Sequence, residues 1–243
     1  MSIERVKAWV TEARHIAVLT GAGVSAESGV PTFRDAQTGL WAKFDPQELA
    51  TDAAYRAQPA RVWDWYAHRR EMLSQAQPNA GHFALARYAL AHPGRLTLIT
   101  QNVDGLHQRS GQPETIALHG SLAEDQWLDA PRDCCLAQAP VNGRPPVCGT
   151  CGNMRRPAVV WFGENLPPEA LAAAEAAVNR CDLMLVVGTS GQVYPAAGLA
   201  FAAHQRGARV VVINPENTEL DRIAEVCLCL PSASSLPFLL EPV

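Results

Sequence analysis

The stretch GAGVSAESG (Gly21–Gly29) follows directly on the apolar run HIAVLT (His15–Thr20). A short apolar run that ends at a glycine-rich turn is typical of a buried parallel strand leading into a helix. Gly21 and Gly23 can adopt positive φ and let backbone N–H groups approach a pyrophosphate. We expect the helix to begin near Ser25, so that its positive dipole end faces the same place. We therefore interpret the turn as a phosphate-binding turn.

Further strands and helices alternate along the chain. Short apolar runs that predict buried strands lie at Leu96–Thr100, Leu183–Val187, Arg209–Ile213 and Val226–Leu230. The alanine-rich stretch Pro168–Arg180 and the stretch Pro195–Arg206, which ends at Gly207, have helix start and stop signals. This alternation predicts an α/β fold, namely a Rossmann-like, doubly wound parallel sheet with helices on both faces.

Two insertions interrupt the alternation. Residues 35–78 contain several helical pieces rich in Trp and Arg, and residues 121–157 are polar and rich in Pro, Gly and Cys. We expect a single domain over 1–243. Its Rossmann-like lobe would comprise 1–34, 79–120 and 158–243, and the helical and Cys-containing (zinc-ribbon-like) insertions would form a small second lobe. Ligands of doubly wound sheets bind at the carboxyl ends of the strands, so the cleft should lie between sheet and small lobe.

Composition and charge exclude some classes of partner. The chain has 243 residues, 48% of them apolar, and a formal net charge of −4. With no long basic run, this charge gives no reason to expect nucleic acid. Residues 1–10 lack the apolar core of a signal peptide and no run is long enough to span a bilayer, so we expect no membrane partner. Seven cysteines without a secretory signal are most simply reduced thiols, which predicts a cytoplasmic protein. We also expect a monomer.

The glycine turn differs from a dehydrogenase fingerprint. That fingerprint is G-x-G-x-x-G, but here Ala26 holds the place of the third glycine and Gly29 comes too late. A glycine pair alone does not indicate a phosphate site, because it is equally typical of an ordinary strand-to-helix turn. The following segment Pro31–Asp35 is unusual for a simple connection, because an aromatic (Phe33) next to an arginine (Arg34) suits covering a ribose and a charged leaving group.

Six short motifs follow one another in order: GAG with Ser25–Arg34, QNVD (Gln101–Asp104), HG (His119–Gly120), VWFGE (Val160–Glu164), GTS (Gly188–Ser190) and NPE (Asn214–Glu216). Together they resemble the sirtuins, a family of NAD-dependent protein-lysine deacylases, over nearly the whole chain. The resemblance implies NAD as cofactor and acylated-lysine proteins as substrates. It also implies free lysine, nicotinamide and an O-acyl-ADP-ribose as products.

Three polar residues of this series suit the cleavage of the bond between nicotinamide and ribose. The short side chains of Asn102 and Asp104 can hold the nicotinamide carboxamide and an ordered water. His119 can take a proton from a ribose hydroxyl, a task that suits a side chain with a near-neutral pKa. A lone His119 would be interpreted as a packed core histidine, which is how we interpret the other histidines.

Residues after the other predicted strands are expected to bind NAD. Gly188–Ser190 can present backbone and hydroxyl groups to the adenosine ribose, and Asn214 can reach the same ribose. By resemblance, Ser232 contacts the adenine. Each could be ordinary turn chemistry, but a shared place after consecutive parallel strands favours a site. The predicted NAD site consists of Gly21, Ala22, Gly23, Ser25, Ala26, Phe33, Arg34, Gln101, Asn102, Val103, Asp104, Gly188, Thr189, Ser190, Asn214, Pro215, Glu216 and Ser232.

The first insertion contains a candidate acyl-binding pair. In WDWYAHRRE (Trp63–Glu71), Tyr66 and Arg69 would share one helix face. A tyrosine hydroxyl beside an arginine fork can bind a carboxylate; the alternative is an amphipathic helix with a solvated arginine. The stretch resembles the Tyr-x-x-Arg signature of class III sirtuins, which remove succinyl, malonyl or glutaryl groups, and Ala50 falls at the small pocket residue of that class. We expect these acyl groups to be preferred over acetyl. The predicted substrate site is Ala50, Tyr66, Arg69, Val160 and Phe162.

The cysteine-rich insertion departs from the family pattern. Sirtuins usually bind a structural zinc with two Cys-x-x-Cys pairs, and CGTC (Cys148–Cys151) is the second. The places of the first pair hold Trp127 and Ala130. Cys134 and Cys135 come slightly later and are adjacent, which suits a zinc knuckle poorly. Either these two swing in, or the insertion is stable without metal, with Trp127 as an apolar plug. We expect less than one zinc per chain.

Two other function classes remain open. An ADP-ribosyltransferase or NAD glycohydrolase would use the same NAD site, but neither needs the carboxylate clamp of Tyr66 and Arg69. A non-catalytic NAD-binding sensor needs no base, so Asn102, Asp104 and His119 count against it. The glycine spacing disfavours a classical dehydrogenase.

Overall fold

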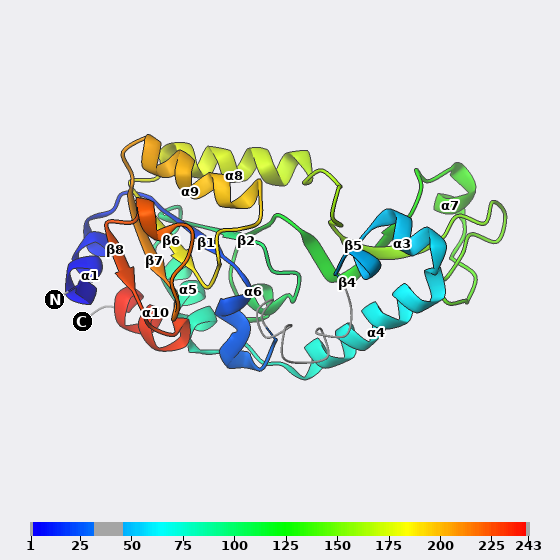
Figure 1. Cartoon of the computed structure of the whole chain (residues 1–243), viewed down its shortest axis with the longest axis horizontal. Coiled ribbons are helices and arrows are strands. Elements are labelled where there is room, and N and C mark those ends of the chain that lie inside the picture. The colour runs from blue at the N-terminus through cyan, green and yellow to red at the C-terminus, as the bar shows by residue number, and fades with distance from the viewer. Residues whose placement is uncertain (1, 32–45, 242–243) are drawn as a thin grey trace.

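A parallel sheet of six strands forms the centre of the larger lobe (Figure 1). The structure is a computed structural model that describes residues 2–31 and 46–241. The strands are β1 (Ile16–Thr20), β2 (Leu96–Thr100), β3 (Thr115–Ala117), β6 (Leu183–Val187), β7 (Arg209–Ile213) and β8 (Val226–Leu228). Their order across the sheet is β3-β2-β1-β6-β7-β8, and each neighbouring pair is parallel.

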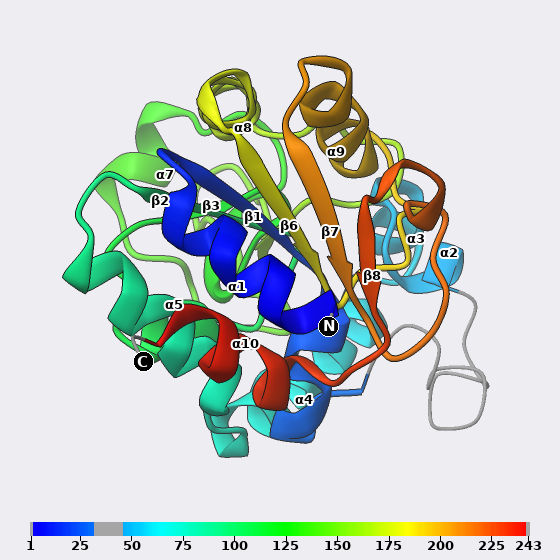
Figure 2. The same ribbon diagram turned by 90° about the vertical axis from the view of Figure 1, so that its left-hand side faces the viewer.

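Helices cover both faces of this sheet (Figure 2). On one face lie α1 (Ser2–Glu12), α5 (Ala80–Ala91) and α10 (Ser232–Leu240), and on the other α8 (Pro168–Arg180) and α9 (Ala196–Gln205). Alternate residues of a strand point to opposite faces. In β1, accordingly, Ile16 belongs to one hydrophobic core and Leu19 to the other. The predicted doubly wound α/β fold is confirmed.

A smaller lobe lies beyond the carboxyl edge of the sheet, at the right of Figure 1. It contains α2 (Pro46–Leu49), α3 (Asp52–Ala57), α4 (Pro59–Gln75), α7 (Asp133–Ala137) and the antiparallel pair β4 (Gly120–Trp127) and β5 (Arg155–Val159). Its core joins residues of helices, of strands and of the loop after β5, namely Leu49, Tyr55, Val62, Tyr66, Leu122, Val159 and Trp161. The two insertions therefore pack together.

β4 was not anticipated from the sequence. It buries only Leu122, so it has neither the continuous apolar run nor the strict alternation that predicts a strand. β4 forms by pairing with β5 across the intervening insertion. β3 is a short strand of three half-buried residues at an edge of the sheet.

The glycine turn has a different geometry from the one expected. Neither Gly21 nor Gly23 has positive φ, since φ of Gly21 is −130°. A Cβ added to Gly21 would lie 2.7 Å from the Thr189 side chain, and one added to Gly23 would lie 2.7 Å from the Gly188 Cα. The glycines are therefore needed for close packing against the end of β6. The helix after β1 is a short 3₁₀ helix, η1 (Ala22–Ser28), so it begins earlier than Ser25.

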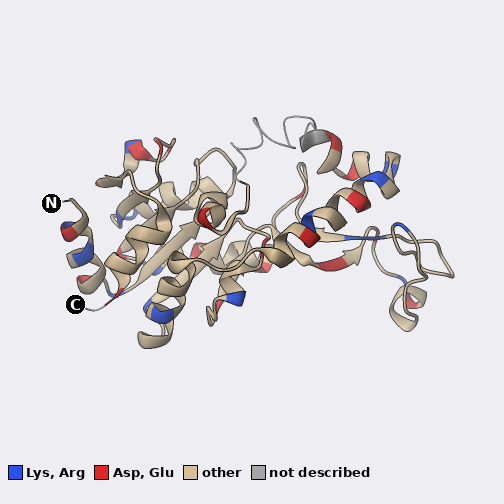
Figure 3. Cartoon of the chain, turned by 90° about the horizontal axis from the view of Figure 1, so that it is seen from below, with Lys and Arg blue, Asp and Glu red and all other residues tan. Residues whose placement is uncertain are grey.

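The surface charges are mixed. Figure 3 shows basic and acidic side chains interspersed over both lobes. Among residues 2–31 and 46–241, no helix is both long and apolar enough to cross a membrane.

Candidate functional site

The predicted NAD residues that the structure describes meet at the carboxyl edge of the sheet. Gly21–Ser25 follow β1, Gln101–Asp104 follow β2, Gly188–Ser190 follow β6 and Asn214–Glu216 follow β7, while Ser232 begins α10 after β8. Because all these strands are parallel, their carboxyl ends lie at one edge, where doubly wound folds bind ligands. Phe33 and Arg34 lie outside the described residues.

Asn102, Ser25 and Asp104 form a hydrogen-bonded group at this edge. The Ser25 hydroxyl donates to Asp104 Oδ2 at 2.7 Å and accepts from Asn102 Nδ2 at 3.2 Å. The other oxygen of Asp104 accepts the backbone N–H of Leu106 at 2.9 Å, at the start of α6 (Leu106–Arg109). Both predicted polar side chains are thus held in fixed orientations.

Gln101 connects three strands of the sheet to the candidate base. Its backbone N–H donates to Thr20 O at 3.0 Å, and its side-chain Nε2 donates to Thr189 Oγ1 at 3.0 Å. Its carbonyl oxygen lies 3.0 Å from Nδ1 of His119. Gln101 therefore fixes the position of His119 relative to the ends of β1 and β6.

The contact with Gln101 decides which nitrogen of His119 can act as a base. A carbonyl oxygen only accepts hydrogen bonds, so Nδ1 must carry the proton and Nε2 has the lone pair. Burial lowers the pKa of His119, and the Gln101 carbonyl opposes this shift. The imidazole is therefore neutral near pH 7, which is the form that a general base requires.

Two buried histidines lie behind this group. The rings of His82 and His107 are 4.8 Å apart, and burial lowers their pKa values to about 4 and about 3. His107 Nε2 bonds to Thr20 Oγ1 at 3.0 Å, and His82 Nε2 lies 3.4 Å from the hydroxyl of Ser25. Our interpretation as packed core histidines fits their burial but missed the contact with Ser25. The only sequence signal is Asn79, whose capping-box spacing places His82 at the start of α5.

The residues at the sheet edge fit a dinucleotide. The Ser232 hydroxyl is buried, and no residue in the described part of the chain bonds to it. A buried polar atom without a partner at a ligand-binding edge suits a polar group of a bound molecule. Asn214 Nδ2 donates to Glu216 O at 2.6 Å, which orders the loop after β7. Together with Thr189, these residues offer polar groups where the sequence predicted the adenosine half of NAD.

The predicted acyl site lies in the core of the small lobe. Tyr66 belongs to this core, and Ala50 and Val103 pack against it. Phe162 donates its backbone N–H to Ala50 O at 2.9 Å and is itself 46% exposed. The backbone N–H of Val160 donates to the carbonyl of His119 at 2.9 Å. Of the predicted substrate residues, Val160 is therefore bonded directly to the candidate base.

Arg69 packs on aromatic rings of this lobe and interacts electrostatically with Asp104. Its guanidinium is 4.8 Å from the ring centroid of Trp65 and 5.7 Å from that of Tyr66. Burial lowers the pKa of Arg69, while Tyr66 and Asp104 act in the opposite direction. Arg69 also lines a cavity of about 360 Å³ that reaches the end of the phosphate turn at Val30. The predicted clamp is thus close to the predicted NAD site.

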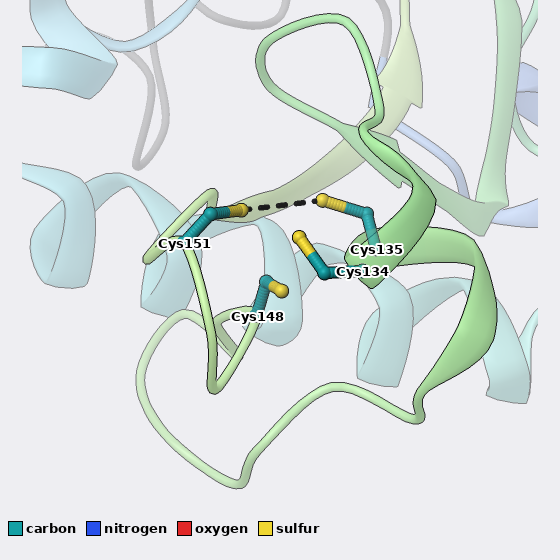
Figure 4. Close-up of side chains that lie close together, drawn as sticks. All are labelled: Cys134, Cys135, Cys148 and Cys151. Carbon is teal, nitrogen blue, oxygen red and sulfur yellow. Dashed lines mark hydrogen bonds between the residues drawn. The ribbon is translucent and has the colours of Figure 1, made fainter.

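The four cysteines of the second insertion converge on one point (Figure 4). The sulfur atoms of Cys134, Cys135, Cys148 and Cys151 all lie within 4.8 Å of one another. Tetrahedral zinc with Zn–S distances of about 2.3 Å needs sulfurs roughly 3.8 Å apart, so the set fits zinc. Backbone N–H groups of Cys151 and Thr150 lower the pKa of the Cys148 thiol to about 6, whereas the hydrogen bond to Cys151 raises the pKa of the Cys134 thiol. Our argument that adjacent cysteines suit a knuckle poorly is wrong, because the turn of α7 directs both sulfurs inward.

Trp127 does not replace a zinc ligand in this arrangement. Its indole packs against the guanidinium of Arg155, which lies 4.9 Å from the ring centroid. The predicted apolar plug would have had to fill the space between the cysteine pairs. The cysteines themselves occupy that space.

Comparisons with known proteins agree on one family. A family model described as "Sir2 family" matches residues 21–195. The "NAD-dependent protein deacylase" of Ralstonia nicotianae is 56% identical over 97% of this chain and 95% of that protein. The protein of the same name from Methylococcus capsulatus is 48% identical over 98% of this chain and 96% of that protein.

Solved structures are similar over the same length. A Sir2 homologue in complex with NAD superposes with a TM-score of 0.87 at 43% identity, covering 98% of this chain and 92% of that one. A mutant Sir2 homologue in complex with ADP-ribose gives a TM-score of 0.88 at 42% identity, covering 98% and 94%. The similarity therefore includes both lobes.

Proposed function

Since the chain belongs to the Sir2 family and is an NAD-dependent protein-lysine deacylase, we propose that the acyl groups it removes are the acidic ones: succinyl, malonyl and glutaryl. Acetyl would be a weaker substrate. Deacylation takes precedence over the ADP-ribosyltransferase, NAD glycohydrolase and sensor functions that the sequence left open.

The residues at the sheet edge suit defined roles in this reaction. Bound NAD supplies an electrophilic ribose carbon and a nicotinamide leaving group. We assign Asn102 and Asp104 to holding the carboxamide and an ordered water, since Ser25 fixes both side chains. His119 would accept a ribose hydroxyl proton at Nε2, because Nδ1 is committed to Gln101.

One observation carries the acyl preference: the Arg69 guanidinium lies 5.7 Å from the ring centroid of the buried Tyr66 and interacts electrostatically with Asp104. An acyl chain that enters beside Ala50 and Val103 would bring its distal end toward this pair. An arginine binds a carboxylate more strongly than it binds a neutral group, since the hydrogen bonds are charge-assisted. A methyl group, as in acetyl-lysine, gains nothing from the same pair.

A panel of acyl-lysine peptides tests the proposal. The wild-type protein is incubated with saturating NAD and peptides that differ only in the acyl group, and kcat/KM is measured for each. We expect succinyl, malonyl and glutaryl peptides to exceed the acetyl peptide. A higher kcat/KM for acetyl or for a neutral long acyl group would refute the acidic preference and leave the deacylase activity standing.

We further propose that the four cysteines hold a structural zinc. Zinc would cross-link α7 to the loop before β5, far from the reacting atoms, so it would stabilise the small lobe. Thiolate ligands require reduced cysteines, which supports the proposal of a cytoplasmic protein. A monomeric state stays a prediction, which sedimentation of the purified protein would test.

A further inference from the structure

Trp161 is in direct contact with one of the two proposed acyl-binding residues. Its indole Nε1 donates a hydrogen bond to the Tyr66 hydroxyl at 2.9 Å, and both side chains are buried. An indole N–H can only donate, so the Tyr66 oxygen must accept. The phenolic hydrogen of Tyr66 therefore points away from Trp161. Within the described part of the chain, the Tyr66 hydroxyl has no hydrogen bond besides the one from Trp161.

The position of the indole is itself tightly determined. The guanidinium of Arg156 lies 3.4 Å from the ring centroid of Trp161. Arg156 is buried and bonds to the carboxylate of Glu164, with Nη2–Oε2 at 3.0 Å, and to Val159 O at 2.6 Å. The backbone N–H of Trp161 donates to the same Glu164 carboxylate at 2.8 Å. The buried Arg156, paired with Glu164, thus holds the indole, and the indole holds the tyrosine.

We propose that Trp161 is a positioning residue for acyl selectivity, which holds the Tyr66 hydroxyl by its oxygen and so directs the phenolic hydrogen toward the distal carboxylate of an acidic acyl group. The inference rests on the proposed function. A hydroxyl rotates freely when it has no partner, and fixing it before the substrate arrives removes that ordering cost from binding. The donated hydrogen bond also polarises the phenol and makes it a better donor.

Orientation and simple packing predict different kinetics. If Trp161 only supports the core, its loss should affect all acyl substrates alike. If it orients Tyr66, only substrates with a distal carboxylate should suffer. That carboxylate is remote from the reacting atoms and is bound equally in the ground and transition states, so the loss should raise KM and leave kcat unchanged.

A double-mutant cycle separates the two roles. Trp161→Phe, Tyr66→Phe and the double variant are compared by the ratio of kcat/KM for succinyl and acetyl peptides at saturating NAD. We expect Trp161→Phe to lower this ratio roughly 3- to 10-fold, the range for one neutral hydrogen bond. In the Tyr66→Phe background the same change should leave the ratio unaltered. Equal losses for both peptides, or an undiminished effect without the Tyr66 hydroxyl, would overturn the inference.

A control variant removes a hydroxyl from the same core. The Tyr55 ring is 5.1 Å from that of Trp161, but its hydroxyl donates to the carbonyl of Arg155 and not to Tyr66. Tyr55→Phe should leave the succinyl-to-acetyl ratio unchanged. A fall as large as that of Trp161→Phe would show that any disturbance of the core moves selectivity, and would overturn the inference.

A second variant covers the case in which Trp161→Phe does not fold. Replacing Trp161 by benzothienylalanine exchanges the N–H for sulfur and keeps both rings and their packing. It should reproduce the same selective rise in KM. If this variant keeps the wild-type succinyl-to-acetyl ratio, the inference about Trp161 is overturned, while the proposed acidic-acyl preference stands. A wild-type protein that does not remove succinyl groups would instead refute the proposed function, and the inference with it.

Discussion

Replacing Arg69 by methionine should separate acidic from neutral substrates. The substitution removes the charge and the donor fork but keeps an unbranched apolar stem of similar length. Arg69 lies beside Tyr66 and within the electrostatic reach of Asp104. We therefore expect two effects: the loss of a carboxylate partner, which only acidic acyl groups feel, and a change near the NAD site, which all substrates share.

The size of the selective effect follows from the bond that is lost. A hydrogen bond to a charged group contributes about 1.5–3 kcal/mol, which corresponds to roughly 10–150-fold in kcat/KM. The stacking of Arg69 on Trp65, 4.8 Å from the ring centroid, adds about 0.5–1 kcal/mol to folding stability. Arg69→Met should therefore lose most of its desuccinylation while remaining folded at assay temperature.

The assay compares kcat/KM for succinyl and acetyl peptides of identical sequence, at saturating NAD. Arg206→Met is the matched control, because Arg206 is exposed and bonds to the carbonyl of Ala202 in α9, which belongs to the larger lobe. It makes the same change in charge and should leave the succinyl-to-acetyl ratio unaltered. Arg69→Lys should give an intermediate ratio, since it keeps the charge and loses the fork.

One result would refute this reasoning. If Arg69→Met lowers kcat/KM equally for both peptides, then Arg69 supports the fold or the NAD site and does not bind the acyl group. The acidic preference would then lack its physical basis, whatever the peptide panel shows.

Further predictions concern the base, pH and zinc. His119→Ala should lower deacylation ~10²–10⁴-fold with an unchanged unfolding transition; a variant that keeps most of its turnover would exclude His119 as the base. Because burial lowers the pKa of His119, kcat/KM should stay on its plateau to below pH 6.5 and fall only as the imidazole protonates; a fall already centred above pH 6.5 would contradict this. The pKa values of His82 and His107, about 4 and about 3, lie below the unfolded value of 6.5, so stability should drop as pH falls below 6.5, by roughly 2 kcal/mol for each between pH 7 and 5; a chemical-denaturation series with no such slope would refute their neutral burial. Elemental analysis should find one zinc per chain, lost in Cys148→Ser together with thermal stability; metal-free wild-type protein of full stability would disprove a structural zinc.

The sequence alone determined the fold class and the edge of the sheet where the polar residues gather. A run such as Leu183–Val187 is short and apolar at every position, which is typical of a strand buried on both faces. Polar residues that follow several such runs must meet at one edge, because parallel strands end on the same side. Gln101–Asp104 and Asn214 could therefore be placed together before any contact was known.

The contacts between side chains were decided only by the tertiary structure. Gly21 and Gly23 must be glycines because the chain returns at Gly188 and leaves no room for a Cβ, whereas local turn chemistry had suggested positive φ. Cys134 and Cys135 are adjacent, and only the short α7 turns both sulfurs toward the second cysteine pair. The hydrogen bond from Trp161 to Tyr66 joins residues far apart in the sequence. Periodicity and propensity describe each segment alone, while such contacts depend on where the packed core brings separate segments together.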